Sequence, residues 1–428
     1  MKKGILIKYG EIVLKGNNRA QFENRLIKDI KVGLKDVVSS VNVTKEQGRF
    51  YMEAPSEGTE EWMEAVIDVL QRVFGIIGIC PVDVLENDDI DTICDGMIEY
   101  VKREFDEPHT FKVFAKRTNK QYPMDSMAIA AEIGSRLLDV LPDWTVDVHN
   151  PEIKLYAELR NRVYVYGKEI KGPGGLPVGT GGKGTLLLSG GIDSPVAGWM
   201  MAKRGVQLSA VYFHAHPYTS DRAKDKVLEL ARRVSAYAGP ICVYVVPFTE
   251  IQMDIYEKCQ HEKMTIIMRR QMMRIAEKIA EMEHSQCLIT GESVGQVASQ
   301  TLASLNCTNA VCTMPVFRPV IGFDKQDIIE IAKKIDTFET SILPYEDCCT
   351  IFVAKHPTTQ PQLEAIIESE KPLVNIEEQI DRAVRDSERY LVRESGWKKI
   401  RIDNEEDEAD KADADDEAKS SLTEIIEL

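Results

Sequence analysis

Residues 189–194 read Ser-Gly-Gly-Ile-Asp-Ser and directly follow the apolar run Thr185–Leu188. Two adjacent glycines allow backbone conformations closed to other residues, so successive N–H groups can converge on an anion. Ser194 and Pro195 then have the chemistry of a helix start, as an N-cap and a first helical residue. We therefore expect a strand, a phosphate-binding loop and a helix that ends at Gly205, with the positive end of the helix facing the loop.

This loop is not a Walker A motif, because no Gly-Lys-Ser/Thr follows its glycines. The order Ser-Gly-Gly-x-Asp-Ser instead resembles the PP-loop of the ATP pyrophosphatases. Enzymes of that class hold the β and γ phosphates of ATP and leave the α phosphorus open to attack, so they transfer AMP and release pyrophosphate. The alternative is a glycine-rich turn that only caps a helix. The strand before the loop and the helix after it favour the phosphate-binding interpretation.

Composition and charge predict a globular protein of several domains. A chain of 428 residues exceeds one ordinary core, and its length predicts about two to four domains. No apolar run approaches a membrane span and no leader-like segment follows Met1, so we expect a cytoplasmic protein without a membrane partner. Nine cysteines without a CxxC pair argue against a disulfide scaffold or a zinc ribbon. Residues 403–428 carry −10 of the net charge of −16, which predicts a disordered acidic tail over 401–428 and leaves nucleic-acid binding open.

The chain divides at a glycine-rich linker, residues 171–184. After it, over residues 185–400, short apolar runs alternate with helical patterns, as in a doubly wound α/β domain with a parallel sheet. The helical patterns include Asp221–Tyr237 and one long segment, Glu250–Met282. Ligands of such sheets bind beyond the carboxyl ends of the strands. The predicted strands are Thr185–Leu188, Leu208–Phe213, Ile241–Val246 and Cys287–Thr290, so the expected ligand-binding loops begin at Ser189, His214, Pro247 and Gly291.

Before the linker, the patterns predict two small α+β domains, residues 1–60 and residues 61–170. The second contains a basic cluster that has no acid among its nine residues 112–120, and one further arginine lies on the next predicted helix. Phosphates are the natural partners of such a cluster, and a solvated cationic surface is the alternative. The basic residues are Lys112, Lys116, Arg117, Lys120 and Arg136.

Several segments carry a resemblance to known families. Residues 8–16, Lys-Tyr-Gly-Glu-Ile-Val-Leu-Lys-Gly, resemble a ferredoxin-like domain that precedes THUMP in one family. Residues 111–120, 146–151 and 157–160 resemble the THUMP domain itself, which binds tRNA. With the PP-loop and three later motifs, residues 1–400 resemble the tRNA 4-thiouridine synthetases, which are also thiamine-pathway sulfurtransferases. The later motifs are Gly291–Gln300, Arg318–Pro319 with Asp324–Lys325, and Pro344–Cys349.

The resemblance implies that a tRNA uridine at position 8 is adenylated at O4 and that sulfur then replaces AMP. It implies that Lys325 stabilises phosphate charge and that Cys348 carries the sulfur as a persulfide. Asp193 lies at the predicted helix start, where a carboxylate is tolerated, so we expect it to organise Mg²⁺ and pyrophosphate, with a helix cap as the alternative role. The ATP contacts that the resemblance implies are Leu187, Leu188, Ser189, Gly190, Gly191, Ser194, Tyr212, Phe213, Arg269, Gly291 and Gln300. The basic cluster of residues 112–136 becomes the expected tRNA surface.

The sulfur route stays open, because no rhodanese domain follows Trp397, whereas some members of the family carry one. Either a cysteine desulfurase delivers persulfide to Cys348 or another thiol, or sulfide serves directly. Cys349 is an alternative carrier, and Cys307 and Cys312 either pack in the core or join a metal–sulfur site. The resemblance also implies a sulfur-carrier protein of thiamine synthesis as a partner, and family members commonly form homodimers.

Two other functions compete with this prediction. One is another AMP-forming PP-loop ligase that acts on tRNA, such as a lysidine or amide-forming synthetase, which the THUMP-like segment and Cys348 disfavour. The other is a non-catalytic tRNA-binding protein, which the intact Ser189, Asp193, Ser194 and Lys325 disfavour.

Overall fold

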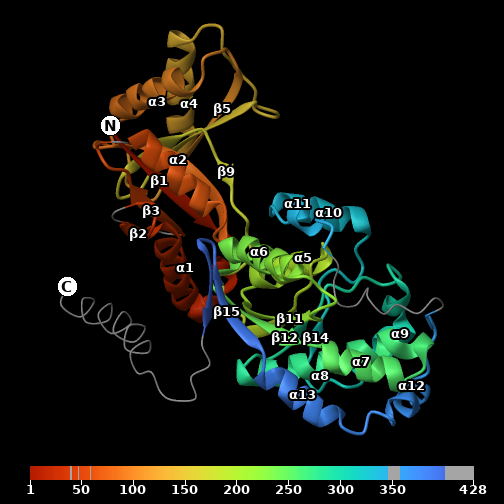
Figure 1. The fold of residues 1–428 in the computed structure, drawn as a ribbon. Helices are drawn as coiled ribbons and strands as arrows, with labels where there is room; N and C mark the ends of the chain where they lie inside the picture. The colour runs from red at the N-terminus through yellow and green to blue at the C-terminus, as the bar shows by residue number, and fades with distance from the viewer. Residues whose placement is uncertain (39–40, 47, 58, 346–356, 401–428) are drawn as a thin grey trace. The chain divides into compact units, whose positions relative to one another are not determined.

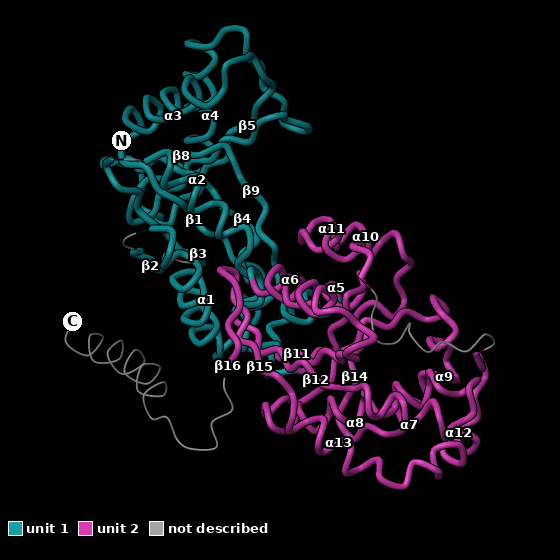
Figure 2. Tube along the Cα trace, viewed as in Figure 1, with its two compact units in different colours: residues 1–184, 197–208, 236–239 teal, residues 185–196, 209–235, 240–428 magenta. Residues whose placement is uncertain are grey.

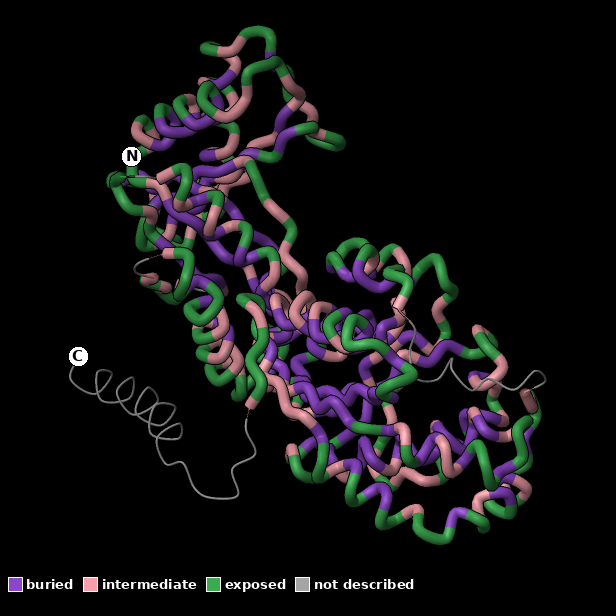
Figure 3. Tube along the Cα trace, viewed as in Figure 1, coloured by how far each residue is buried: buried purple, intermediate pink, exposed green. Residues whose placement is uncertain are grey.

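The structure is a computed structural model that describes residues 1–38, 41–46, 48–57, 59–345 and 357–400 (Figure 1). It separates into two compact units (Figure 2). Unit 1 contains residues 1–184, 197–208 and 236–239, and unit 2 contains residues 185–196, 209–235 and the chain from 240 onward. No helix among the described residues is long and apolar enough to cross a membrane. Buried residues follow the strands and the inner sides of the helices (Figure 3).

Unit 1 is built on one nine-stranded sheet with the order β2-β3-β1-β4-β8-β7-β5-β6, in which β9 also pairs with β4. Helices α1 and α2 share a core with β1 and β3, whereas α3 and α4 pack on β8 and β5. The strands are β1 (Lys2–Tyr9), β2 (Val43–Glu46), β3 (Arg49–Glu53), β4 (Ile76–Leu85), β5 (Thr110–Arg117), β6 (Thr145–Val146), β7 (Ile153–Leu159), β8 (Val163–Tyr166) and β9 (Ile170–Lys171). The helices are α1 (Arg19–Leu34), α2 (Thr59–Leu70), α3 (Ile90–Glu104) and α4 (Ser126–Val140).

Strand β4 connects the two N-terminal segments into this single sheet. It pairs antiparallel with β1 from Lys2↔Val84 to Tyr9↔Ile76, and its end pairs with β8. The core around Ile5 and Leu26 also contains Val66 and Ile79. Residues on both sides of the expected division at residue 60 therefore share one core.

The sheet of unit 1 curls, so that strands distant in the sheet order meet across one face. The rings of Tyr51 on β3 and Tyr164 on β8 lie 5.4 Å apart. Three strand spacings separate these strands, which would be about 14 Å in a flat sheet. Glu158 on β7 lies inside the curl and accepts hydrogen bonds from Arg49 Nη1 at 2.7 Å, Tyr166 Oη at 2.7 Å and Arg160 Nε at 2.9 Å.

Glu158→Ala is expected to destabilise unit 1 by about 3–5 kcal/mol, because the Arg49 guanidinium stays buried and loses its partner, the Glu158 carboxylate. The side chains of Arg49 and Glu158 are 11% and 1% exposed. Hydrogen exchange of β3 and β7 in the full chain measures this loss locally. The matched control is Arg162→Ala, which breaks a surface pair with Glu53 and should cost less than about 1 kcal/mol. Equal hydrogen-exchange protection of β3 in both variants would contradict the stabilising role of the Arg49–Glu158 pair.

Unit 2 contains a seven-stranded sheet with the order β14-β13-β10-β11-β12-β15-β16. The pairs β10–β13, β13–β14 and β11–β12 are parallel, which confirms the expected α/β sheet. The strands are β10 (Lys183–Leu187), β11 (Gln207–His214), β12 (Ile241–Pro247), β13 (Leu288–Ile289), β14 (Val316–Phe317), β15 (Glu388–Arg393) and β16 (Gly396–Ile400). Two helices begin in unit 2 and end in unit 1: α5 (Asp193–Lys203) and α6 (Asp221–Ala238). The other helices are α7 (Thr249–Lys258), α8 (Met264–Met282), α9 (Leu302–Asn309), α10 (Lys325–Lys334), α11 (Phe338–Ser341), α12 (Leu363–Glu370) and α13 (Ile376–Arg385).

Two features of unit 2 differ from the sequence-based expectation. The sheet is mixed, because the hairpin β15–β16 adds two antiparallel strands to β12. The expected single helix over Glu250–Met282 is two helices, α7 and α8, because Cys259 and Gln260 leave the helical conformation. Both helices place apolar side chains in the same core, which explains why the helical pattern continues across the break. Figure 1 shows α7, α8 and α13 on one side of the sheet and α6 on the other.

Candidate functional site

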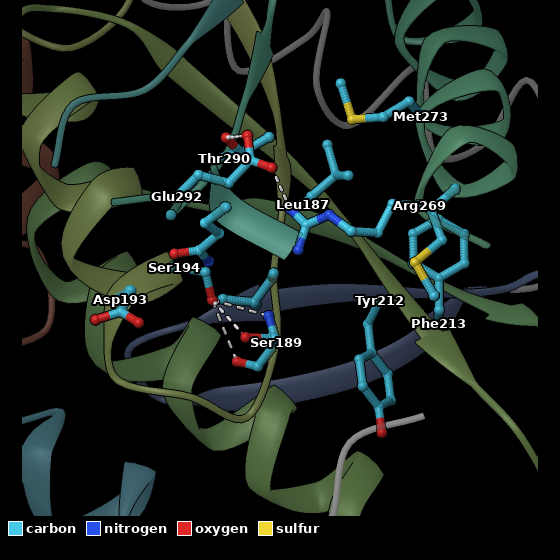
Figure 4. Close-up of a pocket in the computed structure, with 14 residues that line it drawn as sticks. Leu187, Ser189, Asp193, Ser194, Tyr212, Phe213, Arg269, Met273, Thr290 and Glu292 are labelled. Carbon is cyan, nitrogen blue, oxygen red and sulfur yellow. Dashed lines mark hydrogen bonds and ion pairs between the residues drawn. The ribbon is translucent and has the colours of Figure 1, made fainter. Parts of the chain in front are cut away.

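A cavity of about 250 Å³ lies at the carboxyl ends of β10, β11 and β13 in unit 2 (Figure 4). Ten of the residues expected from the sequence line it, from five separate stretches of chain. They are Leu187, Leu188, Ser189, Asp193, Ser194, Tyr212, Phe213, Arg269, Gly291 and Gln300. Four further lining residues were not expected: Met272, Met273, Thr290 and Glu292. Gly190 and Gly191 lie within the loop between Ser189 and Asp193.

The hydroxyl groups of two serines close the loop of residues 189–194. The backbone N–H of Ser189 donates to Ser194 Oγ at 2.9 Å, and the two hydroxyl oxygens lie 3.1 Å apart. Helix α5 begins at Asp193, two residues before the expected first helical residue Pro195, so the prediction that Ser194 is the N-cap is wrong. Ser194 sits inside the first turn, where its hydroxyl reaches back to the loop. The N-terminus of α5 therefore faces the cavity and favours an anion there.

Gly291 is required by the contact between the β13 loop and the start of α5. A Cβ at this position would lie 2.6 Å from Ser194 N and 2.7 Å from the carbonyl carbon of Asp193. Such distances do not occur between non-bonded atoms, so only glycine fits without a shift of the backbone. The backbone at Gly291 thus lies directly against the start of α5.

Asp193 connects three segments that are distant in sequence. Its Oδ1 accepts a hydrogen bond from Lys325 Nζ at 2.6 Å, and its Oδ2 accepts one from Gln296 Nε2 at 2.8 Å. Lys325 is the first residue of α10, and Asp324 caps that helix by accepting from Asp327 N at 3.0 Å. The structure thus brings together the two residues expected to act on phosphate, and it adds Gln296. Gln296 lies in the motif 291–300 but was not selected from the sequence.

A buried carboxylate and two arginines form the wall beside Gly291. Glu292, which is 3% exposed, accepts from Arg318 Nε at 2.7 Å and Thr290 Oγ1 at 2.8 Å, and it forms an ion pair with Arg269. Burial alone would raise the pKa of Glu292, but the charges of the two arginines outweigh burial and lower it. Glu292 is therefore ionised at neutral pH. Two guanidinium groups and one carboxylate leave one positive charge at this wall.

The remaining wall of the cavity is apolar. Leu187, Phe213, Met272 and Met273 line it together with Tyr212. Figure 4 shows Ser189, Asp193 and Ser194 on one side of the view, and Phe213 and Met273 on the other. A ligand with a flat apolar part and a polyanionic part matches this division, because aromatic and thioether side chains pack on rings while the helix N-terminus holds anions.

One carboxylate of the cavity fits a magnesium ion. Mg²⁺ binds proteins through one or two carboxylates and takes its other ligands from waters and substrate phosphates. Asp193 meets this requirement at the loop. Within the described ranges, no group of three or more His, Cys, Asp or Glu side chains could hold a metal ion by itself.

The expected tRNA surface belongs to unit 1 and not to the cavity of unit 2. Cys348 and Cys349 fall outside the described residues. Cys307 is buried in the core of unit 2, and Cys312 packs partly buried beside Met273. On β5, Lys112 and Lys116 alternate with Phe111, Val113 and Ala115, so they point away from the helix-covered side of the sheet.

The two arginines of the basic cluster contact other residues of unit 1. Arg117 Nη1 donates to Asn119 O at 2.9 Å, close to the exposed Lys120. Arg136 lies on α4, where it pairs with Asp91 at 2.7 Å and with Glu132 at 2.8 Å. Lys112 and Lys116 therefore lie on the face of the sheet that α4 does not cover. Arg136 lies on α4, on the opposite face, where it is paired with two acidic residues.

Family models match the chain in three consecutive segments. A ThiI ferredoxin-like domain matches residues 4–80, a THUMP domain matches residues 87–167, and "Thiamine biosynthesis protein (ThiI)" matches residues 179–374. The expected order of a ferredoxin-like, a THUMP and a PP-loop part is thereby confirmed.

Curated relatives and a solved structure match almost the full length. A probable tRNA sulfurtransferase of Lachnospira eligens is 55% identical over 92% of this chain and 100% of the relative. A probable tRNA sulfurtransferase of Lachnoclostridium phytofermentans is 56% identical over 90% of this chain and 97% of its own. The chain also resembles the protein in the crystal structure of a 4-thiouridine synthetase–RNA complex with bound ATP. The two sequences are 36% identical, and the structures match with a TM-score of 0.84 over 92% of this chain and 100% of that chain. Because this similarity covers about nine-tenths of its length, the chain belongs to the tRNA sulfurtransferase family.

Proposed function

We propose that this protein uses ATP to adenylate the uridine at position 8 of tRNA and then replaces the adenylated oxygen with sulfur, which gives 4-thiouridine. The observation that carries the proposal is the contact between Asp193 and Lys325, which are 132 residues apart, at the PP-loop. Ten residues that the sequence predicts for the ATP site line the cavity beside this loop. The solved 4-thiouridine synthetase that resembles this chain was crystallised with RNA and ATP.

The residues of the cavity fit the activation step. The loop of residues 189–194 and the N-terminus of α5 hold the β and γ phosphates, while Tyr212 and Phe213 pack on adenine. Uridine O4 attacks the α phosphorus, an O–P bond forms, and pyrophosphate leaves. Asp193 would hold Mg²⁺, which would supply positive charge for the leaving pyrophosphate. Lys325 and Arg269 stabilise the negative charge of the phosphates from their own positions.

The second step needs sulfur at C4 of uridine. The outer sulfur of a persulfide on Cys348 attacks C4, and AMP leaves. A second thiol then attacks Cys348 Sγ and forms a disulfide with it, so that the outer sulfur stays on the base, and an external thiol reductant regenerates Cys348. A cysteine desulfurase is the proposed source of the persulfide. Transfer of sulfur to a carrier protein of thiamine synthesis is a further role, supported by the thiamine-biosynthesis description of the matching family model.

Gly291→Ala is expected to raise the Kd for ATP by about tenfold or more, because the loop must move by a large fraction of an ångström to remove the clash with Ser194. Isothermal titration with ATP and Mg²⁺ measures the change. Gly322→Ala is the matched control, since a Cβ there would meet nothing within 4 Å. If both variants bind ATP like the wild type, the close approach at Gly291 has no role in binding.

The double variant Lys112→Ala/Lys116→Ala is expected to weaken tRNA binding and to lower the slope of log Kd against log salt by about 1 to 2, because each phosphate contact releases counterions. ATP binding should stay unchanged. Arg136→Ala is the comparison, and its effect should be smaller because Asp91 and Glu132 already neutralise Arg136. A larger loss for Arg136→Ala would move the tRNA surface to the helical side.

Mass spectrometry of tRNA after reaction tests the whole proposal. Unmodified tRNA is incubated with the protein, ATP, Mg²⁺, a cysteine desulfurase and cysteine. A gain of one sulfur for one oxygen at position 8 is the expected product. Pyrophosphate release with a different modification would favour another AMP-forming PP-loop ligase, and tRNA binding without any reaction would favour a non-catalytic protein.

A further inference from the structure

Glu292 is a carboxylate on the wall of a cavity that is otherwise suited to phosphates. It lines the cavity, it is almost completely buried, and its charge would repel a polyphosphate. A buried carboxylate is tolerated where cations and hydrogen bonds compensate it. Here the compensation comes from two arginines that approach different oxygens of the same side chain.

The two arginines occupy different positions. Arg269, on α8, lines the cavity and pairs with Oε1 of Glu292. Arg318 follows β14, is not among the lining residues, and donates its Nε to Oε2 at 2.7 Å. Arg318 Nη1 also donates to Asn309 Oδ1 at 3.2 Å and to Val316 O at 3.4 Å, so the guanidinium is held from several sides.

The charges decide what each arginine contributes. With both arginines present, the group of Arg269, Glu292 and Arg318 carries one net positive charge that faces the cavity through Arg269. Without Arg318, the Glu292 carboxylate is neutralised by Arg269 alone, and the group has no net charge. Arg269 would then have to break its ion pair with Glu292 before it could bind a phosphate.

We infer that Arg318 is a positioning residue for ATP binding. It neutralises Glu292 from behind the cavity wall and thereby leaves the Arg269 guanidinium available for a phosphate of ATP. Arg318 acts through Glu292, because it contacts that carboxylate and does not line the cavity. This inference rests on the proposed role of Arg269 as an ATP ligand.

The inference predicts a rescue that loss of folding would not produce. Arg318→Met should raise the Kd for ATP by about tenfold or more, because the remaining ion pair competes with phosphate for Arg269. Glu292→Gln combined with Arg318→Met should bind ATP within about threefold of the wild type, because a neutral amide competes weakly for a guanidinium. If Arg318 only supports the local structure, the double variant should bind as weakly as the single variant or more weakly.

The experiment is a titration of the full-length protein with ATP and Mg²⁺, without tRNA, beside the thermal midpoint of each variant. Arg274→Met is the matched control, since Arg274 lies on the same helix as Arg269 and pairs with Glu377. Wild-type affinity in Arg318→Met overturns the inference, as does a double variant that is not rescued. Arg269→Met separates the two claims. If it binds ATP normally, the proposed ATP contact of Arg269 fails as well; if it binds weakly while Arg318→Met binds normally, only the inference fails.

Discussion

Asp193→Ala is expected to lower tRNA-stimulated pyrophosphate release by about a hundredfold or more, with saturating ATP, Mg²⁺ and tRNA. Asp193 lies at the start of α5, where it meets Lys325 and Gln296. Its removal takes away the proposed protein ligand of Mg²⁺ and leaves Lys325 without its carboxylate partner. The release rate measured with a coupled pyrophosphate assay gives the effect directly.

Gln296→Ala is the control for this prediction, because it removes the neutral partner of Asp193 and leaves the carboxylate in place. Its rate should fall by less than about tenfold, since a neutral hydrogen bond contributes less than a charged one. A rate for Asp193→Ala within threefold of the wild type would exclude this carboxylate from the chemistry.

Cys348→Ser is expected to reduce 4-thiouridine to background and to leave tRNA-stimulated pyrophosphate release within about twofold of the wild type. A serine hydroxyl cannot carry a persulfide, whereas activation of uridine needs no thiol. Mass spectrometry of the tRNA and the pyrophosphate assay, run on one reaction mixture, separate the two steps. Loss of both steps would remove Cys348 from its proposed role as sulfur carrier.

Cys312→Ser distinguishes a persulfide from a metal–sulfur site. Cys312 packs partly buried against the core near Met273 and Leu288. If Cys348 acts alone, Cys312→Ser should make 4-thiouridine at nearly the normal rate. An equal loss of thiolation in both variants would indicate that the two cysteines serve one site.

The local parts of the site could be predicted from the sequence because neighbouring residues determine them. A strand, two glycines and a helix start are all encoded within residues 185–195, and the structure shows them with an error of two residues at the helix start. The meeting of Asp193 with Lys325 depends on the path of 132 residues. Only the resemblance to a known family indicated that pair.

The Glu292 cluster could not be predicted from the residues alone. Its members come from α8, from the end of β13 and from the residue after β14, and their contacts arise from tertiary packing. The motif 291–300 was visible, but within it only Gly291 and Gln300 were selected. A glutamate beside an anion site contradicts simple charge complementarity, so its residue type does not indicate a place in this site.

The missed elements have similar causes. In β15 and β16, charged residues occupy most of the exposed positions, and only Val392 is buried, so neither strand shows a clear apolar alternation. The curl of the unit 1 sheet depends on pairs such as Arg49 with Glu158, which lie 109 residues apart. Such long-range pairs leave no periodic signal in the sequence.

Pyrophosphate release with two matched tRNAs tests the central claim most directly. One tRNA carries uridine at position 8, and the other differs only by cytidine at that position, which has an amino group in place of O4. Release of pyrophosphate that is stimulated by the uridine-8 tRNA and absent with the cytidine-8 tRNA is the predicted result. Equal stimulation by both tRNAs would contradict adenylation of O4 of this uridine.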